Sequence, residues 1–305
     1  MEQKSILFVC TGNTFRSAIA EQSFRKYLND NNIPGWKVGS AGIIARKDSM
    51  DPKTVSSLEM LGVSSIKHRQ KKLTRKMLKR HDIIVAMAEN HAEFIKTKLG
   101  FSRVLLFNEL ATNKKTSVLD IQDEVKDYRT NRRAVERKIE KTACHIFRNI
   151  PNLFKNASER YYLFSDFVDG YKTHRNGFPF IRLHETKNTV SFMSINIPSK
   201  EDGHILIIPK KRYPDLSEIP KNVLNELSLS IQQIGAAISK NHGGYNLLLN
   251  NGIEAGQWIY HTHFHIVPRK YNDGIKIEVW KHQNISIKKF IYLNRRLRRQ
   301  IQSAG

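Results

Sequence analysis

The chain is poor in cysteine and in acidic residues. Its 305 residues include 2 cysteines, Cys10 and Cys144, and 28 acidic side chains against 51 lysines and arginines. Two cysteines cannot build a disulfide framework or a four-cysteine zinc site, and they are typical of a reducing compartment. We therefore expect a cytoplasmic protein.

Long apolar runs are also absent. No stretch approaches the roughly 20 apolar residues that cross a bilayer, and the apolar segment near the N-terminus is too short for a secretion signal. No glycine- or serine-rich stretch interrupts the chain, so we expect a short, semi-rigid connection between its domains. The length predicts about two of them.

The excess of basic residues is spread along the chain. The formal net charge is +23, which attracts nucleic acid, anionic membrane surfaces or acidic proteins, although it is also compatible with a merely solvated surface. A basic cluster at 288–299 is interleaved with Tyr292 and Leu297. This pattern predicts a terminal helix with a basic face, for which nucleic acid is an expected partner and membrane contact the alternative.

The segment 5–17 places a cysteine between an apolar, strand-like run and the start of a helical pattern. Cys10 ends the run, and Arg16 follows six residues later. Such a loop can aim successive backbone N–H groups and a helix N-terminus at a tetrahedral oxyanion. The same donors favour the thiolate of Cys10, and the planar fork of Arg16 can hold two phosphoryl oxygens. The pattern indicates a cysteine phosphatase; the alternative is a buried core cysteine.

Other residues of this loop fit the same chemistry. Gly12 and Asn13 tolerate a left-handed backbone, and Ser17 can hydrogen-bond the thiolate. The segment resembles the low-molecular-weight protein tyrosine phosphatase family, whose opening pattern is V-C-x-G-N-x-C-R-S-x-x-A-E. The matching residues are Val9, Cys10, Gly12, Asn13, Arg16, Ser17, Ala20 and Glu21.

Asp123 is the general acid that this resemblance implies. The segment from Asp120 to Asp123 is similar to the D-I-x-D-P segment that carries the acid of the family. A carboxylic acid placed there would protonate a poor leaving group in the transition state. The residues by themselves leave another interpretation open, in which Asp120 and Asp123 cap the N-terminus of a helix.

Thr14 bears on the substrate of this half. Tyrosine-specific relatives usually carry an aliphatic residue at this place, whereas residues 11–14 read T-G-N-T, which resembles bacterial protein arginine phosphatases. A small hydroxyl residue can accept a bond from a guanidinium that a bulky alkyl group would exclude. Phosphotyrosine and phosphoarginine on proteins are therefore both expected substrates.

Three histidines alternate in the second half of the chain. On a strand over 260–267, His261, His263 and His265 would project from one face. Three imidazoles on one face suit either a zinc ion or a phosphate group.

The surrounding pattern resembles the histidine triad (HIT) family of nucleotide hydrolases and transferases. Residues 203–210 are similar to its G-H-x-L-V-I-P-K strand, and residues 250–257 to its N-x-G-x-x-A-G-Q segment. The resemblance implies that His263 is a nucleophile that carries a nucleotidyl group, without a metal or another cofactor. It implies substrate-binding or orienting roles for His204, Asn250, Gln257, His261 and His265.

Two departures from the HIT pattern weaken the expected nucleotide binding. Trp258 replaces the usual serine or threonine, and Ser194 stands where an acidic residue normally binds ribose.

The nucleophile must be a neutral imidazole, which the ordinary histidine pKa near 6.5 makes the major form at neutral pH. Since HIT relatives are often dimers, the resemblance also implies a homodimer.

The fold expected from these patterns is α/β. The first half alternates apolar runs with helical stretches, which predicts a parallel sheet with flanking helices. The second half has longer β runs around one helix near 221–240, which predicts an α+β domain with an antiparallel sheet. We place the domains at 1–152 and 158–305, the second including the basic tail, with a closing helix over 136–148 that stops at Pro151.

The function predicted from the sequence is a bifunctional phosphorus-ester hydrolase that acts on phosphorylated proteins and on nucleotides. The alternative is a catalytically weak module that binds phosphorylated ligands or nucleic acid.

Overall fold

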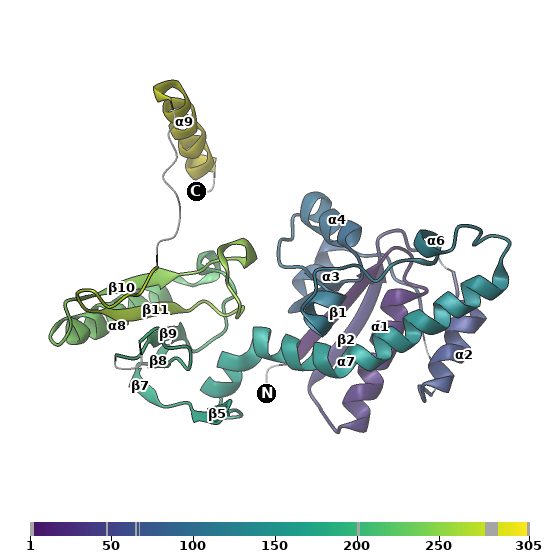
Figure 1. Ribbon diagram of the computed structural model, residues 1–305, viewed down its shortest axis with the longest axis horizontal. Coiled ribbons are helices and arrows are strands. Elements are labelled where there is room, and N and C mark those ends of the chain that lie inside the picture. The colour runs from purple at the N-terminus through teal and green to yellow at the C-terminus, as the bar shows by residue number, and fades with distance from the viewer. Residues whose placement is uncertain are drawn as a thin grey trace.

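The protein is described here by a computed structural model that covers residues 3–46, 48–64, 66, 68–199, 202–277 and 286–303. Figure 1 shows two α/β bodies joined by one long helix. The elements of the first body are β1 (Lys4–Cys10), α1 (Arg16–Asp30), β2 (Trp36–Gly42), α2 (Pro52–Met60), α3 (Arg75–Lys79), β3 (Ile83–Ala86), α4 (Glu89–Leu99), β4 (Leu105–Leu106), α5 (Phe107–Thr112) and α6 (Ile121–Glu124).

The long helix and the second body follow. Their elements are α7 (Arg132–Val168), β5 (His174–Arg175), β6 (Phe178–Pro179), β7 (Arg182–Glu185), β8 (Thr189–Met193), β9 (Ile205–Pro209), η1 (Leu216–Glu218), α8 (Lys221–Ser239), β10 (Gly244–Leu249), η2 (Ile253–Ala255), β11 (Phe264–Arg269) and α9 (Ile287–Ser303).

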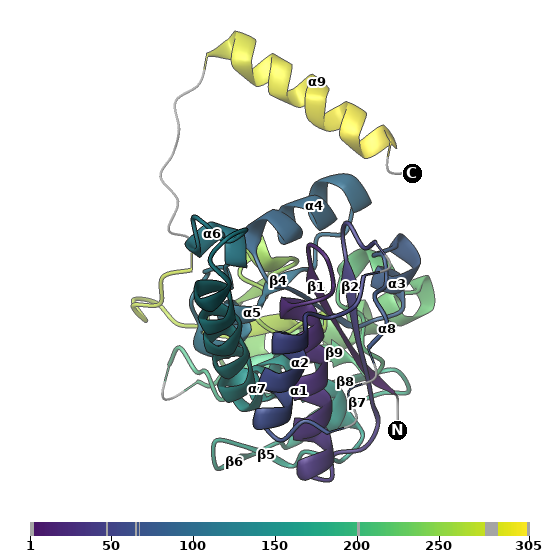
Figure 2. The same cartoon turned by 90° about the vertical axis from the view of Figure 1, so that its right-hand side faces the viewer.

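The first body is a parallel sheet in the order β2-β1-β3-β4, covered on both faces. Alternate side chains of β1 enter different cores: Ile6 and Phe8 pack with α1, α5 and α7, whereas Leu7 and Val9 pack with α3 and α4. Figure 2 shows α1, α2 and α7 gathered on one side of this sheet. Burying each such side chain contributes roughly 1.5–3 kcal/mol, and double-sided burial explains the unbroken apolar run of β1.

Helix α7 corrects the predicted stop at Pro151. The helix runs without interruption for 37 residues, from Arg132 to Val168, with Pro151 inside it, and so spans about 55 Å. Proline lacks the N–H of one helical hydrogen bond, but the apolar stripe continues beyond it through Leu153 and Ala157 and packs on the first body. Because packing outweighs the lost bond, the two bodies share a helix rather than a short connection.

The second body is an antiparallel sheet in the order β10-β11-β9-β8-β7. The two faces of β9 again divide the core: Leu206 and Ile208 pack on Phe164 of α7, and Ile207 packs on α8. The α/β fold class is therefore confirmed, as is the helix expected near 221–240.

The strand expected to carry all three histidines is shorter than predicted. β11 begins at Phe264, so only His265 lies on it, and the expectation that His261 and His263 share its face is wrong. The physical reason is a competing contact: the N–H of Thr262 donates to the carbonyl of Tyr213 at 2.7 Å, and the Thr262 hydroxyl donates to the same oxygen at 2.8 Å. These bonds hold the segment against a loop instead of a neighbouring strand.

Asp82 ties the two bodies together. Its carboxylate accepts hydrogen bonds from the hydroxyls of Ser5 (2.7 Å) and Tyr162 (2.9 Å) and forms an ion pair with Arg212 of the second body. Nearby, Lys4 pairs with Asp166 near the end of α7 at 2.8 Å. Burial, the nearby charge of Asp82 and its hydrogen bond raise the pKa of the Tyr162 hydroxyl well above its usual range, so it stays a donor.

Helix α9 stands away from both bodies in Figures 1 and 2. It forms where the basic tail predicted a helix. Among the described residues, no helix is both long enough and apolar enough to cross a membrane.

Candidate active sites

The loop between β1 and α1 has its backbone carbonyls turned outward. A carbonyl oxygen only accepts hydrogen bonds, so the group that contacts each loop carbonyl is a donor outside the loop. In a trans peptide the C=O and the N–H point in opposite directions, so the N–H that follows each of these carbonyls points toward the inside of the loop. The donors are the N–H of Ile43 for Cys10 O (3.0 Å), the N–H of Ile44 for Thr11 O (2.9 Å), Gln70 Nε2 for Gly12 O, and His68 Nε2 for Asn13 O (2.6 Å). The result is a ring of inward N–H groups suited to an oxyanion.

The sulfur of Cys10 lies within this ring. It accepts the N–H of Asn13 at 3.2 Å and lies 3.0 Å from the hydroxyl oxygen of Ser17. Asn13 adopts φ +57°, the left-handed conformation expected at this place. The loop therefore brings Cys10, Gly12, Asn13, Arg16 and Ser17 together as the sequence predicts.

A buried network fixes the direction of the Ser17 hydroxyl. The side-chain amide of Asn13 donates to Ser17 Oγ at 3.0 Å and to Ser40 Oγ at 2.7 Å, and Ser40 donates to Glu21 at 2.5 Å. Because Ser17 accepts from Asn13, its own proton is available for the sulfur of Cys10, which stabilises a negative charge there.

Sequence reasoning assigned no role to Ser40, Glu21 or His68. Their contribution depends on β2 and on the loop before α3, which only the fold brings beside Cys10. The one local signal is the i, i+4 spacing of Ser17 and Glu21 on α1, which places both on one helical face.

Gly42 allows the loop to sit directly on β2. A Cβ atom at this position would lie 2.8 Å from both the carbonyl carbon of Gly12 and the carbonyl oxygen of Thr11. Both are backbone atoms held by the contacts above, so any other residue would displace the loop.

Arg16 is buried, and three hydrogen bonds hold its guanidinium in place, which leaves other N–H groups of its five for a ligand. Nη1 donates to the carbonyl of Val118 at 3.0 Å, and Nη2 donates to Thr11 Oγ1 at 3.2 Å and to the carboxylate of Asp120. The fork is thus fixed between the loop and the segment that carries the predicted acid.

The capping interpretation of the two aspartates describes the backbone of α6. Asp120 is the N-cap residue, and the Asp123 carboxylate accepts the N–H of Asp120 at 2.9 Å. Asp123 is exposed, and its neighbour Glu124 pairs with Lys138 of α7 at 2.6 Å. Capping leaves the second oxygen of Asp123 available, so it does not conflict with a role as an acid.

His91 of α4 is a further polar residue at the loop that the sequence did not reveal. It is fully buried, and its Nε2 lies 2.9 Å from Thr11 Oγ1. Burial, helped by the charge of Arg16, lowers its pKa to about 3, while the charge of Asp123 acts in the opposite direction. The ring is therefore neutral.

In the second body, the backbone sets the tautomer of His263. Its Nδ1 lies 2.7 Å from the carbonyl of His261, so Nδ1 carries the proton and Nε2 keeps a free lone pair. Burial lowers the pKa of His263, which keeps the ring neutral. His261 is oriented in the same way, because its Nε2 donates to the carbonyl of Pro209 at 2.7 Å.

His204 and His265 form a second oriented pair. His204 Nδ1 donates to the carbonyl of Asn196 at 2.7 Å, which leaves its Nε2 to accept the Nδ1–H of His265 at 2.9 Å. His265 Nε2 then carries a buried lone pair with no hydrogen-bond partner among the described residues, and burial lowers the pKa of this ring to about 3. Within the described part of the chain, no group of three or more His, Cys, Asp or Glu side chains is arranged to hold a metal ion.

The two predicted amide donors lie in different environments. Gln257 is buried with both ends of its amide in use: Oε1 accepts the N–H of Gly252 at 2.8 Å, and Nε2 donates to the carbonyl of Pro214 at 2.9 Å. Asn250 is exposed. Gln257 therefore fixes the shape of the loop before the histidines, whereas Asn250 is open to a ligand.

Trp258 and Ser194, the two departures from the HIT pattern, each contact a neighbouring part of the protein. Trp258 is 48% exposed, and the guanidinium of Arg160 lies 3.8 Å from the centre of its ring. The hydroxyl of Ser194 accepts the N–H of Asn196 at 3.2 Å, which supports the turn that holds His204.

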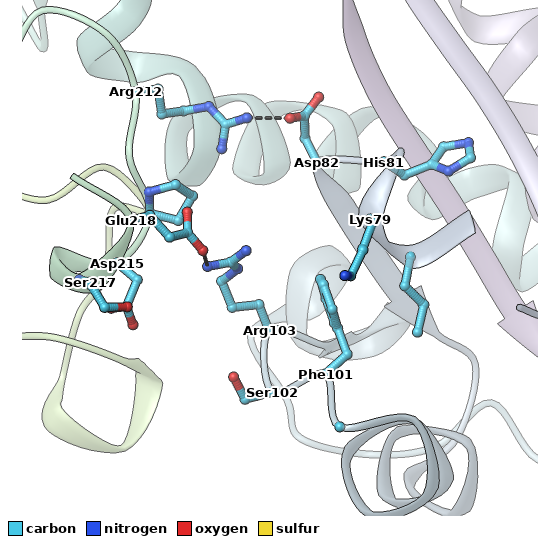
Figure 3. Close-up of a pocket in the computed structure, with 13 residues that line it drawn as sticks. Lys79, His81, Asp82, Phe101, Ser102, Arg103, Arg212, Asp215, Ser217 and Glu218 are labelled. Carbon is cyan, nitrogen blue, oxygen red and sulfur yellow. Dashed lines mark hydrogen bonds and ion pairs between the residues drawn. The ribbon is translucent and has the colours of Figure 1, made fainter. Parts of the chain in front are cut away.

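A cleft between the two bodies lies apart from both candidate sites. It has a volume of about 670 Å³ and is lined by both bodies but by neither Cys10 nor His263. Figure 3 shows the ion pair between Arg212 and Asp82 at one side of it and Arg103 reaching toward Glu218, 2.5 Å away. Two ion pairs cross the domain boundary here, so the cleft is a seam between the bodies.

Comparisons with known families match the two bodies separately. Residues 5–159 match the low molecular weight phosphotyrosine protein phosphatase model, and residues 181–272 match the HIT domain model. The predicted fusion of two families is thereby confirmed.

Curated relatives match the second body. The adenylylsulfatase HINT3 of Arabidopsis thaliana is 43% identical over 97 residues, which are 31% of this chain and 48% of that protein, so the chain spans about half its length. An uncharacterized HIT-like protein of Methanocaldococcus jannaschii is 33% identical over 34% of this chain and 81% of its own. The adenosine 5'-monophosphoramidase HNT1 of Saccharomyces cerevisiae is 32% identical over 41% and 77%.

Solved structures similar to each body are also found. A YwlE mutant from Bacillus subtilis is 25% identical, with a TM-score of 0.44 over 51% of this chain and 99% of that chain. A histidine triad nucleotide-binding protein from Candida albicans is 27% identical, with a TM-score of 0.40 over 47% and 99%.

Proposed function

Because the chain belongs to the low molecular weight phosphotyrosine protein phosphatase family and carries a HIT domain, we propose that it performs one phosphorus chemistry in each half. The first half would dephosphorylate proteins through a phosphocysteine, and the second would cleave adenylylated compounds through an adenylyl group carried on a histidine. The observation that carries the first proposal is the ring of inward N–H groups around Cys10.

In the proposed phosphatase reaction, Cys10 Sγ attacks phosphorus and the bond to the leaving group breaks. Asp123 gives its proton to the leaving atom, and the phosphoryl oxygens receive the loop N–H groups and Arg16. Water, deprotonated by the same carboxylate, then breaks the S–P bond and releases inorganic phosphate. The ring of donors supports this sequence because it favours negative charge both on the sulfur and on the transferring group.

The acid can be identified by comparing two carboxylates of one helix cap. Asp123→Asn should lower the rate on a poor leaving group by about 10²- to 10⁴-fold and leave a good aryl leaving group much less affected. Asp120→Asn is the matched control, because it removes the partner of Arg16 and should affect both substrates alike. If Asp120→Asn shows the leaving-group dependence instead, Asp123 is not the acid.

The substrate that Thr14 favours is phosphoarginine. The side chain of Thr14 is half-buried, and its hydroxyl lies at the loop next to Gly12. There it can accept a guanidinium N–H that an aliphatic side chain would leave unpaired. The test is a side-by-side rate on phosphoarginine and phosphotyrosine peptides. Wild type should prefer phosphoarginine, and Thr14→Ile should shift the ratio toward phosphotyrosine; a preference for phosphotyrosine that Thr14→Ile leaves unchanged would reject this assignment.

In the second half, His263 Nε2 would attack the α-phosphorus of an adenosine 5'-phosphoryl compound as the bond from phosphorus to the leaving group breaks. Water would then break the N–P bond and release AMP. The fixed tautomer of His263 supports this role, since its lone pair faces away from the backbone. The names of two relatives, an adenylylsulfatase and an adenosine 5'-monophosphoramidase, indicate the class of bond. Adenosine phosphoramidate should be hydrolysed to AMP by wild type and by Cys10→Ser, but not by His263→Ala; no hydrolysis by wild type would end this proposal.

Two partner predictions stay open to direct measurement. Nucleic-acid binding through the basic surface predicts retention on DNA or RNA that weakens steeply with salt, and salt-independent binding would reject it. A homodimer through the HIT domain predicts twice the chain mass in solution, which light scattering measures.

A further inference from the structure

Helix α9 combines dense positive charge with a complete lack of acidic residues. Its polar side chains include Lys288, Lys289, Arg295, Arg296, Arg298 and Arg299, and no Asp or Glu occurs between Ile287 and Ser303. The polar side of a solvated helix usually mixes both signs of charge. A face of one sign is instead complementary to an anionic surface.

The apolar residues of α9 lie together on one side. At 100° per residue, Ile287, Ile291, Leu297 and Ile301 fall within an arc of roughly 120°. Asn294 and Arg298 lie within the same arc, and the other basic residues fall on the remainder. These four side chains are 80%, 44%, 52% and 74% exposed. The helix thus presents an ordered apolar stripe that neither body covers.

We propose that α9 lies in the surface of an anionic lipid bilayer, with the apolar stripe among the acyl chains and the basic residues at the headgroups. A strongly amphipathic helix of low mean hydropathy with lysine and arginine on its polar side is suited to this position. Nucleic acid would satisfy the basic residues but would leave the four apolar side chains in water. The lipid surface satisfies both sides of the helix.

The rest of the chain reinforces this choice. Its net charge of +23 has the same sign as the helix, so the field of the two bodies also favours a negative surface. The helix would therefore hold both active sites close to a membrane without a spanning segment.

The test uses the full-length protein and sedimentation with vesicles of two compositions, neutral phosphatidylcholine alone or with about a third phosphatidylserine. The expected result is binding to the anionic vesicles that is at least about tenfold tighter than to the neutral ones and weakens with salt. No binding to anionic vesicles, or equal binding to both, overturns the proposal.

The apolar stripe is tested by the double substitution Leu297→Asn with Ile301→Asn. It should weaken anionic-vesicle binding by about tenfold or more, because the acyl contacts are lost. Tyr292→Asn is the matched control: it removes an exposed apolar group from the basic side of the same helix, where Lys289 lies 5.3 Å from the ring centre, and should change binding much less. Equal losses in the two variants overturn the proposal.

Nucleic acid is examined with the same variants. If double-stranded DNA or RNA binds the protein more tightly than anionic vesicles do, and the double substitution does not weaken that binding, α9 is a nucleic-acid surface and the lipid proposal is rejected. Hydrolysis of an aryl phosphate by each variant should equal that of wild type, which shows that the bodies remain folded.

Discussion

The two candidate sites favour opposite charge states of their proposed nucleophiles. Around Cys10, donors from the loop and from Ser17 surround a sulfur that must be negative to react. Around His263, burial and one backbone carbonyl hold a ring that must be neutral to react. The difference indicates two ways to prepare a nucleophile: hydrogen-bond donors can stabilise its charged form, and burial can favour its neutral form.

The sites also differ in which segments of the chain supply their hydrogen-bond partners. The loop at Cys10 rests on β2, α4 and the segment before α3, which contribute Ser40, His91 and His68. The histidine site rests mostly on carbonyls of nearby loops, at Pro209, Asn196 and His261 itself. Single substitutions can remove one of these contacts at a time.

The largest effect is expected from Arg16→Lys. Lysine cannot reproduce the simultaneous contacts of the guanidinium with Thr11 and Val118, nor hold two phosphoryl oxygens. The rate constant kcat/KM for an aryl phosphate should fall by about 10³-fold. Hydrolysis of adenosine phosphoramidate by the same variant is the internal control and should be unchanged; a parallel fall in both activities would mean that the substitution damages the fold.

Removal of one donor to the sulfur should have a smaller effect. Ser17→Ala should lower the phosphatase rate by about 10- to 100-fold, since a hydrogen bond to a charged group contributes about 1.5–3 kcal/mol. Ser23→Ala is matched to it, because Ser23 is a buried serine of the same helix whose hydroxyl has no hydrogen-bond partner. Comparable losses in the two variants would contradict the role of the Ser17 hydroxyl.

The pH profile distinguishes the neutral nucleophile. Burial lowers the pKa of His263 below the ordinary 6.5, so the ring should stay neutral as the pH falls through that value. An imidazole of ordinary pKa would lose about tenfold of its neutral form between pH 7.5 and pH 5.5, whereas the HIT activity should lose less than that because the pKa of His263 is lowered. Rates measured from pH 7.5 to 5.5, with folding followed by circular dichroism, test this; a fall that tracks an ordinary histidine would contradict it.

The smallest effect concerns the seam between the bodies. Asp82→Asn removes the charge that Arg212 pairs with and weakens the contacts to Ser5 and Tyr162, so it should lower the free energy of unfolding by about 1–3 kcal/mol. Both activities should persist at room temperature. Denaturant unfolding measures the loss, and the exposed pair of Arg132 with Asp51 offers Asp51→Asn as a control with a smaller expected change.

Residues that are contiguous in the sequence could be assigned to the site, whereas residues brought to it from distant segments could not. The loop from Cys10 to Ser17 is contiguous, so its residue types and spacing already indicate its geometry. Ser40 and His91 could not be assigned in this way, because each enters the site from an element whose position depends on the packing of the whole sheet.

The two errors of the sequence analysis share a physical cause. Pro151 predicts a helix end, and the alternation from His261 to His265 predicts a strand. In each case tertiary contacts override the local preference: the apolar stripe of α7 continues past the proline, and Tyr213 captures the backbone of Thr262. A pattern of a few residues does not predict either of these tertiary contacts.

The central claim is that Cys10 becomes phosphorylated during turnover. The most direct measurement is to mix the full-length protein with an aryl phosphate, quench with acid within the first turnover, and locate the phosphoryl group by mass spectrometry of peptides. The account predicts one phosphoryl group on the peptide of Cys10, none on that of Cys144, and none on either in Cys10→Ser. Steady release of phosphate by wild type with no label on Cys10 at any quench time would contradict it.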